Sequence, residues 1–383
     1  MGGMRSSSRS IRPSTILNRS WTVKTSMISI RDRFGWNLVT DDPFSDDSAT
    51  ATRADEPQPT QPSTAQPPLS SHPAAKGMFL AVLSALFYTA ANMTLRRLAG
   101  AENLDAIWIT CNKALIPSLA AWAIIAWRAS QGLPALPPRK MILPLLAAGV
   151  LMQIGGNFMF QLALGYGGLA LTVPLCFATL ITTGALLGRI FLEEAITPRT
   201  AIAMGVLVIA IALLSLSAPG ATESVVNRTG TAVVVLAILT ACLSGVGYGA
   251  CGVVIRRMVT QQIPLSATLV LMSSTGVVGF GAYSLIHLGP AQLATTTFDQ
   301  WAWMMLAGMF TAVAFFAVGG ALKYITVVQA NMLNATQSAM CAIAGVMFFA
   351  EPWTYWLILG TLLTAAGVML VEKKMPPAPA KRR

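Results

Sequence analysis

The sequence has few charged residues and almost no histidine. Asp, Glu, Lys and Arg make up 11% of the chain, against roughly 25% in a soluble domain. Only two histidines are present, His72 and His287. A metal or catalytic site based on histidine therefore has almost no residues to form it, and an integral-membrane enzyme is disfavoured.

Sequence signatures of disulfides, of cysteine metal sites and of ATP binding are also missing. The five cysteines all lie in apolar segments and form no CxxC pair, so we interpret them as small packing residues rather than disulfides or metal ligands. No phosphate-binding GxxxxGK[ST] loop occurs, which excludes ATP-driven action by this chain alone. We expect no cofactor.

Long apolar runs fill the chain after residue 76. Hydrophobic residues make up 54% of the sequence, and residues 141–188 contain no charge. A bilayer span takes about 20 apolar residues. The sequence therefore predicts an all-α polytopic membrane protein with ten transmembrane helices. We expect these spans at 78–95, 106–127, 141–163, 168–188, 199–217, 231–254, 265–286, 301–320, 326–349 and 352–371.

The strongest pattern is an internal duplication. At an offset of 351 − 194 = 157 residues, Ala178, Thr179, Ala185, Gly188, Phe191 and Glu194 recur as Ala335, Thr336, Ala342, Gly345, Phe348 and Glu351. A unit of this length is too long for a solenoid repeat. In a membrane chain it indicates two structural halves around a central site. With five spans in each half, the second half is inverted relative to the first.

The distribution of positive charge predicts the orientation. The net charge of +11 comes mostly from Lys and Arg at one set of loops and ends. With the N-terminus in the cytoplasm, only Arg96, Arg97 and Arg228 lie in outer loops. This bias predicts that both termini are cytoplasmic. The basicity is therefore a topology signal, and the expected partners are the lipid bilayer and a small-molecule substrate, not nucleic acid.

Composition divides the chain into five segments. Residues 1–76 are polar, serine-rich and proline-rich, which predicts a disordered tail. Its acid-poor start is interpreted as a cytoplasmic tail, an upstream extension from a misassigned start codon or a targeting segment. The others are a first repeat at 77–217, a linker at 218–229, a second repeat at 230–372 and a basic cytoplasmic tail at 373–383.

The duplicated motifs resemble a known family. The motifs are Ala163-Leu164-x-Tyr166, Pro174-Leu175 and Phe191-Leu192-x-Glu194, with Ala321-Leu322-Lys323-Tyr324 and Phe348-Phe349-Ala350-Glu351 in the second half. Together they resemble the EamA-type ten-span transporters of the drug/metabolite transporter superfamily. One departure is Asn331-Met332 where the first half has Pro174-Leu175. The resemblance implies a bacterial inner-membrane transporter or exporter of small metabolites, without fixing its substrate.

Polar residues within the spans are the candidate substrate-binding residues. Such groups are costly in hydrocarbon and tend to face a bundle interior or a water cavity. Lys113 is the one clear mid-span charge, interpreted either as an anchor for a substrate carboxylate or phosphate or as a lysine that extends to the headgroups. The other candidates are Tyr88, Asn92, Gln153, Asn157, Gln161, Tyr248, Asn331, Asn334 and Gln337.

Periodicity groups several of these candidates. Gln153, Asn157 and Gln161 are spaced by four and are expected on one helix face. Such a stripe either lines a cavity or joins two helices. Glu194 and Glu351 mark the repeat, each beside the start of a following helix, where a carboxylate is favoured by the helix dipole.

Two further sequence features bear on function. Gly247-x-Gly249-x-x-Gly252 matches a dinucleotide fingerprint, but it lies in an apolar helix and indicates close helix packing. No Asp or Glu lies in mid-span, so a buried carboxylate for proton or sodium coupling is missing.

These observations predict a secondary transporter that works by alternating access, as an exporter or exchanger of a small metabolite or drug-like solute. The alternatives are a passive channel or lipid scramblase, or an antiporter of nucleotide sugars or organic anions.

Overall fold

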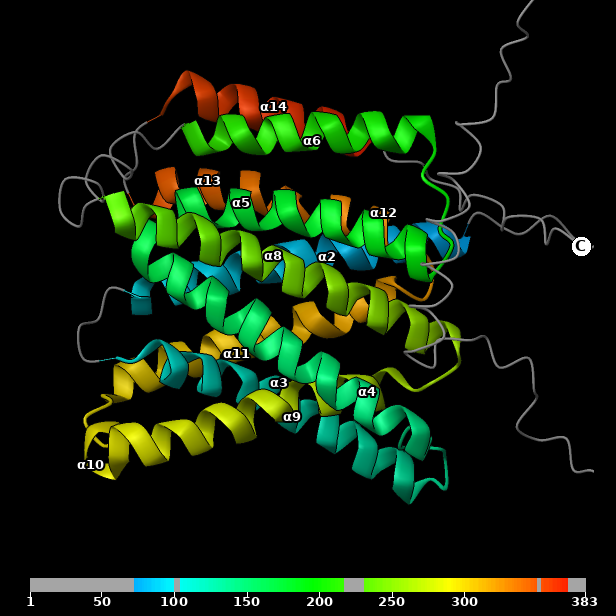
Figure 1. Ribbon diagram of the computed structural model, residues 1–383, viewed down its shortest axis with the longest axis vertical. Coiled ribbons are helices and arrows are strands. Elements are labelled where there is room, and N and C mark those ends of the chain that lie inside the picture. Colours follow the sequence, from blue (N-terminus) through cyan, green and yellow to red (C-terminus); the bar gives the residue numbers. More distant parts are fainter. Residues whose placement is uncertain (1–71, 100–103, 217–230, 350–352, 371–383) are drawn as a thin grey trace, which may run out of the picture. The chain divides into compact units, whose positions relative to one another are not determined.

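The computed structural model describes residues 72–99, 104–216, 231–349 and 353–370, and every regular element in them is helical (Figure 1). The expected linker, the basic C-terminal tail, Glu351 and most of the N-terminal tail lie outside these residues. In chain order the elements are α2 (His72–Ala99), α3 (Ala106–Ser130), α4 (Arg139–Val150), η1 (Leu151–Phe158), α5 (Met159–Phe191), α6 (Pro198–Leu216), α8 (Thr231–Thr260), α9 (Leu265–Tyr283), η2 (Ser284–Leu288), α10 (Gly289–Leu293), α11 (Phe298–Ala321), α12 (Val327–Asn334), α13 (Thr336–Phe349) and α14 (Tyr355–Met369).

Seven helical segments are long and apolar enough to cross a bilayer. They are Pro73–Leu98, Ala106–Ser130, Arg139–Gly167, Leu171–Phe191, Ala232–Thr260, Leu265–Leu293 and Phe298–Ala321. Two further apolar helices, Pro198–Leu214 and Tyr355–Met369, are shorter. The span expected at 326–349 is divided at Ala335 into α12 and α13. The helical membrane fold is confirmed, whereas the count of ten spans stays an expectation for these three segments.

The first helix begins earlier than the sequence indicated. We placed residues up to 76 in the tail, but α2 starts at His72. Pro73 then falls in the first turn, where a missing N–H costs no helical hydrogen bond. Ala74 and Ala75 follow with high helix propensity. Pro73, which we counted in the disordered tail, is thus part of a helix start.

The helical run from α4 through η1 to α5 contains two spans. At 1.5 Å per residue a straight helix from Arg139 to Phe191 would be about 80 Å long, far more than a bilayer thickness of about 30 Å. The run turns back on itself (Figure 1), and its two membrane-spanning segments end at Gly167 and begin at Leu171. The turn lies close to the expected boundary between the spans at 141–163 and 168–188.

Helix α8 packs against both arms of this run through glycines. A Cβ atom added to Gly247 would lie 2.7 Å from the backbone carbon of Gly155 in one arm. A Cβ atom at Gly245 would lie 2.2 Å from the carbonyl oxygen of Cys176 in the other. Neither helix could approach so closely with a larger residue. The helix-packing interpretation of the glycine series is therefore confirmed.

The two halves pair reciprocally. Helix α2 of the first half packs on α11 of the second. The run from η1 to α5 of the first half packs on α8 of the second. The first span of each half thus contacts the third span of the other half. The second spans, α3 and α9, pack on each other, as do the last helices, α6 and α14, which lie side by side in Figure 1. This is the pattern of two inverted repeats related by a pseudo-twofold axis.

Candidate functional site

A cavity of about 140 Å³ lies where the two halves meet. Its walls come from α2, α3, η1, α5, α8, α9, α11, α12 and α13, so both halves contribute. The lining is largely apolar, with a limited set of polar side chains. This combination is typical of a small-molecule site.

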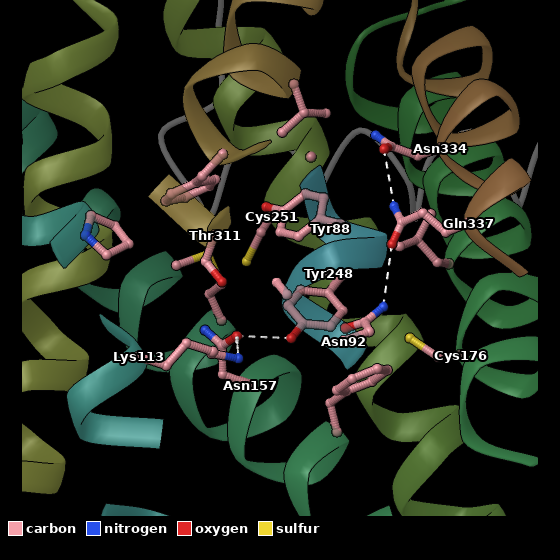
Figure 2. A pocket seen from close by; sticks show the side chains of 18 of the residues that line it. Tyr88, Asn92, Lys113, Asn157, Cys176, Tyr248, Cys251, Thr311, Asn334 and Gln337 are labelled. Carbon is pink, nitrogen blue, oxygen red and sulfur yellow. Dashed lines mark hydrogen bonds between the residues drawn. The ribbon is translucent and has the colours of Figure 1, made fainter. Parts of the chain in front are cut away.

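The structure brings nearly all candidate residues to this one cavity (Figure 2). Those that line it are Tyr88, Asn92, Lys113, Gln153, Asn157, Tyr248, Asn331, Asn334 and Gln337. They come from six elements spread over some 250 residues of sequence, because 337 − 88 = 249. Gln161 is the exception and does not line the cavity.

One group of polar residues, the lysine cluster, consists of Lys113, Gln153, Asn157 and Tyr248. The Lys113 ammonium and the Tyr248 hydroxyl both donate to Asn157 Oδ1, each at 2.8 Å (Figure 2). Asn157 Nδ2 donates to Gln153 Oε1 at 2.8 Å, and Gln153 Nε2 donates to the carbonyl of Met272 at 2.9 Å. The chain of hydrogen bonds fixes the orientation of the Asn157 amide, with its oxygen toward the two donors.

Local backbone features position this cluster. Gln153 and Asn157 lie in the π-helix η1, an irregularity that is frequent at functional sites. Gly276 of α9 leaves the space that Gln153 fills, since a Cβ atom there would lie 2.5 Å from the Gln153 amide carbon. In α3, Pro117 has no N–H to donate to the carbonyl of Lys113 four residues earlier.

The same π-helix explains why Gln161 departs from the expected stripe. Each π-turn closes its hydrogen bond one residue later than an α-turn, so residues beyond η1 are rotated relative to a regular helix. Gln161 is 3% exposed, away from the cavity. Its Oε1 has no hydrogen-bond partner among the described residues.

A second group, the amide cluster, consists of Asn92, Asn334 and Gln337. Asn92 Nδ2 donates to Gln337 Oε1 at 3.5 Å, and Gln337 Nε2 donates to Asn334 Oδ1 at 3.1 Å (Figure 2). Nearby, Asn331 Nδ2 donates to the carbonyl of Leu180 at 3.4 Å. These links connect α2 and α5 of the first half with α12 and α13 of the second.

The cavity carries one charged group. Of the described residues that line it, only Lys113 is ionisable to a cation, and none is Asp or Glu. Lys113 is 5% exposed and makes no ion pair within the described part of the chain. Its ammonium therefore gives the cavity a positive potential that no fixed carboxylate offsets.

Glu194 lies outside the cavity and has a different role from the one expected. We expected it beside the start of the next helix, but that helix, α6, is capped by Thr197, whose Oγ1 accepts from the N–H of Thr200. Glu194 instead accepts from Arg256 Nε at 3.2 Å and, at the start of α12, from the N–H of Val327 at 3.0 Å. Burial raises the pKa of Glu194, and the Arg256 guanidinium and the Val327 N–H lower it in part.

Several lining residues were not identified from the sequence. Cys176 and Cys251 were interpreted as packing residues, while Ser273 and Thr311 were not singled out. Cys251 follows Tyr248 by three residues, and this spacing places both on one helix face. Ser273 begins a short run of small polar residues, Ser273-Ser274-Thr275, and Thr311 stands alone in an apolar helix. Neither has a helical periodicity that distinguishes it.

Comparison with known proteins agrees with this architecture. A solved structure titled "Crystal structure of protein" superposes with a TM-score of 0.59 and 16% sequence identity, over 77% of this chain and 96% of the other. At that identity the likeness shows the fold alone. No curated protein matches the chain. The model of the EamA-like transporter family matches residues 75–216 and again 235–372. Because these two matches cover most of the sequence, the chain belongs to the EamA-like transporter family, whose members are membrane transporters of small solutes.

Proposed function

We propose that the protein carries a small solute across the membrane by alternating access, with the cavity between the halves as its binding site. The supporting observation is that the cavity is lined from both segments that match the family, 75–216 and 235–372. A site shared between inverted repeats can be exposed to either side when the repeats rock against each other.

A set of contacts that we name the arginine latch supports this mechanism. In it, Glu194 of the first half accepts hydrogen bonds from Arg256 and from the N–H of Val327, both in the second half. Arg256 also donates from its guanidinium to the carbonyl of Leu322, a residue that lines the cavity. The latch therefore joins the halves beside a residue that lines the cavity. We propose that this is the cytoplasmic side, as the positive-charge bias of the loops favours.

The volume and the lining of the cavity also help to distinguish between the alternative substrates and transport modes. Its volume of about 140 Å³ is below the roughly 300–1,000 Å³ of sites for drug-sized ligands. A compact metabolite is therefore favoured over a nucleotide sugar in this conformation. The absence of Asp and Glu among the described lining residues favours exchange or facilitated movement over proton antiport.

Counterflow into proteoliposomes tests the proposal. Vesicles are preloaded with a mixed metabolite pool, and uptake of a labelled pool is read by mass spectrometry. We expect saturable uptake that increases when the same solute is present inside. Uptake that is linear in concentration and independent of the internal solute would indicate a channel, and lipid scrambling without solute uptake would indicate a scramblase.

A variant pair at one lining residue makes this test specific. Thr311→Trp places a large ring in the cavity and should abolish uptake, whereas Thr311→Val keeps the side-chain volume and should retain it. Equal uptake by the two variants would mean that the solute does not pass through this cavity.

A further inference from the structure

The lysine cluster has the geometry of an occupied oxyanion site. Lys113 Nζ and Tyr248 OH come from α3 and α8, yet both end 2.8 Å from a single oxygen, Asn157 Oδ1. Two convergent donors, one of them charged, bind a carboxylate oxygen more strongly than neutral donors do. A neutral amide oxygen is a weaker acceptor for the same donors.

We propose that the transported solute is a compact monoanion, whose carboxylate displaces Asn157 from Lys113 and Tyr248 when the solute binds. This inference rests on the proposed function and identifies the class of substrate. Asn157 acts as an internal substitute for the solute oxygen and keeps the ammonium hydrogen-bonded while the cavity is empty of solute.

The single positive charge of the cavity determines which net charge of the solute is preferred. Lys113 is the one cation among the described lining residues, so a single negative charge neutralises the site. A dianion would leave an unpaired negative charge in an apolar enclosure, which is costly. A cation would be repelled by Lys113. The expected order of affinity is monoanion first, then neutral solutes, with dianions and cations last.

The remaining walls define the rest of the solute. Phe160, Phe177 and Phe315 supply apolar and aromatic surface, and the amide cluster offers neutral hydrogen-bonding groups. A cavity of about 150 Å³ is enough to hold benzene, close to the volume found here. A small aromatic or branched aliphatic acid fits both the volume and the lining.

Isosteric probes that differ in charge test the inference. Benzoate, benzamide and benzamidinium have the same number of heavy atoms and charges of −1, 0 and +1, and phthalate adds a second negative charge. Binding to the purified full-length protein in detergent is measured by titration calorimetry. We expect benzoate to bind about tenfold more tightly than benzamide. The reason is that the hydrogen bond from the Tyr248 hydroxyl, which is neutral with benzamide, becomes charge-assisted with benzoate. Benzamidinium and phthalate should bind more weakly than both.

Variants assign this preference to the cluster. Lys113→Gln should bring benzoate down to the affinity of benzamide, whereas Lys113→Arg, which keeps the charge, should retain the preference in part. Asn157→Asp places a permanent carboxylate beside Lys113 and should abolish benzoate binding. Gln161→Leu is the matched control, a buried polar residue of the same helical run that lies off the cavity, and should bind like wild type.

The outcomes separate the two proposals. Equal affinity of wild type for the three isosteres, or no binding of any of them, would overturn the monoanion inference. Solute counterflow that is blocked by Thr311→Trp would then still support the transporter proposal. If Lys113→Gln fails to fold, Asn157→Asp decides the question, and undiminished benzoate binding by that variant would contradict the proposal.

Discussion

The Lys113 ammonium is a costly group to bury in the apolar interior of the protein. A lysine at the centre of a membrane helix costs about 2.5–3.5 kcal/mol even on insertion scales, and among the described residues Asn157 is the one that accepts from it. Because of that cost, Lys113 could be identified from the sequence as a candidate substrate-binding residue. The same reasoning, that polar groups are costly within a span, identified Gln153, Asn157 and Asn92. Gln161 was grouped with them wrongly, because a spacing of four predicts a shared face only in a regular α-helix.

Gln161 gives the first prediction. Its buried Oε1 accepts no hydrogen bond among the described residues, so Gln161→Leu removes an unsatisfied group and should stabilise the protein by about 1 kcal/mol. The measurement is the thermal melting temperature in detergent, which should rise. Solute uptake should stay at the wild-type level. A lower melting temperature would mean that Gln161 binds a group not seen in this conformation.

At the level of elements, the long uninterrupted spans were predictable from hydropathy, and the irregular ones were not. The boundary between the spans at 141–163 and 168–188 was located within a few residues of the turn. The π-helix η1 and the division of α12 from α13 gave no comparable signal. The start of α12 combines a local and a tertiary contact. Thr326 and Gln329 form a capping box, with Thr326 Oγ1 accepting from the N–H of Gln329 at 3.2 Å. The tertiary contact comes from Glu194, which accepts from the N–H of Val327 at 3.0 Å. A partner 133 residues away cannot be read from a local pattern.

The packing of α8 gives a prediction at this scale. Gly247→Ala would place a Cβ atom 2.7 Å from the backbone of Gly155 and should cost about 1–3 kcal/mol by overpacking. Gly205→Ala in α6 is the control, since its Cβ atom would meet nothing within 4 Å. That substitution should leave stability unchanged or raise it through helix propensity. Equal melting temperatures for the two variants would contradict the close helix contact.

At the scale of the whole molecule, the duplication predicted two inverted halves and a central site. It did not predict which helices pair across the halves, because pairing depends on close contacts between particular side chains. Gly308 of α11, for example, lies where a Cβ atom would be 3.0 Å from Ile116 of α3. The arginine latch was not predicted either, although Glu194 was noted as a repeat residue.

The arginine latch gives a prediction for the conformational equilibrium. Glu194→Gln removes the charge that Arg256 pairs with, so the halves should separate more readily at that end and expose Cys251, which lines the cavity. Labelling of Cys251 by a membrane-impermeant maleimide at fixed pH should increase several-fold. Asp299→Asn, which removes an exposed carboxylate at the start of α11, should leave labelling unchanged.

Acidification should act in the same direction as Glu194→Gln. Burial raises the pKa of Glu194, so its carboxylate takes up a proton at a higher pH than an exposed glutamate does. The ion pair with Arg256 is present above that pKa and is lost as the pH falls through it. Unchanged hydrogen exchange at the start of α12 between neutral and mildly acidic pH would contradict this role for the latch.

The reciprocal pairing of the halves has a consequence for synthesis of the chain. Helix α2 ends at Ala99, and its main partner α11 begins at Phe298, 298 − 99 = 199 residues later. At about 5–20 residues per second of translation, roughly 10–40 s pass between the synthesis of α2 and the start of synthesis of α11. During that interval its small and polar residues face lipid or the insertion machinery. We therefore expect the first half to reach its native packing only after α11 has been synthesised.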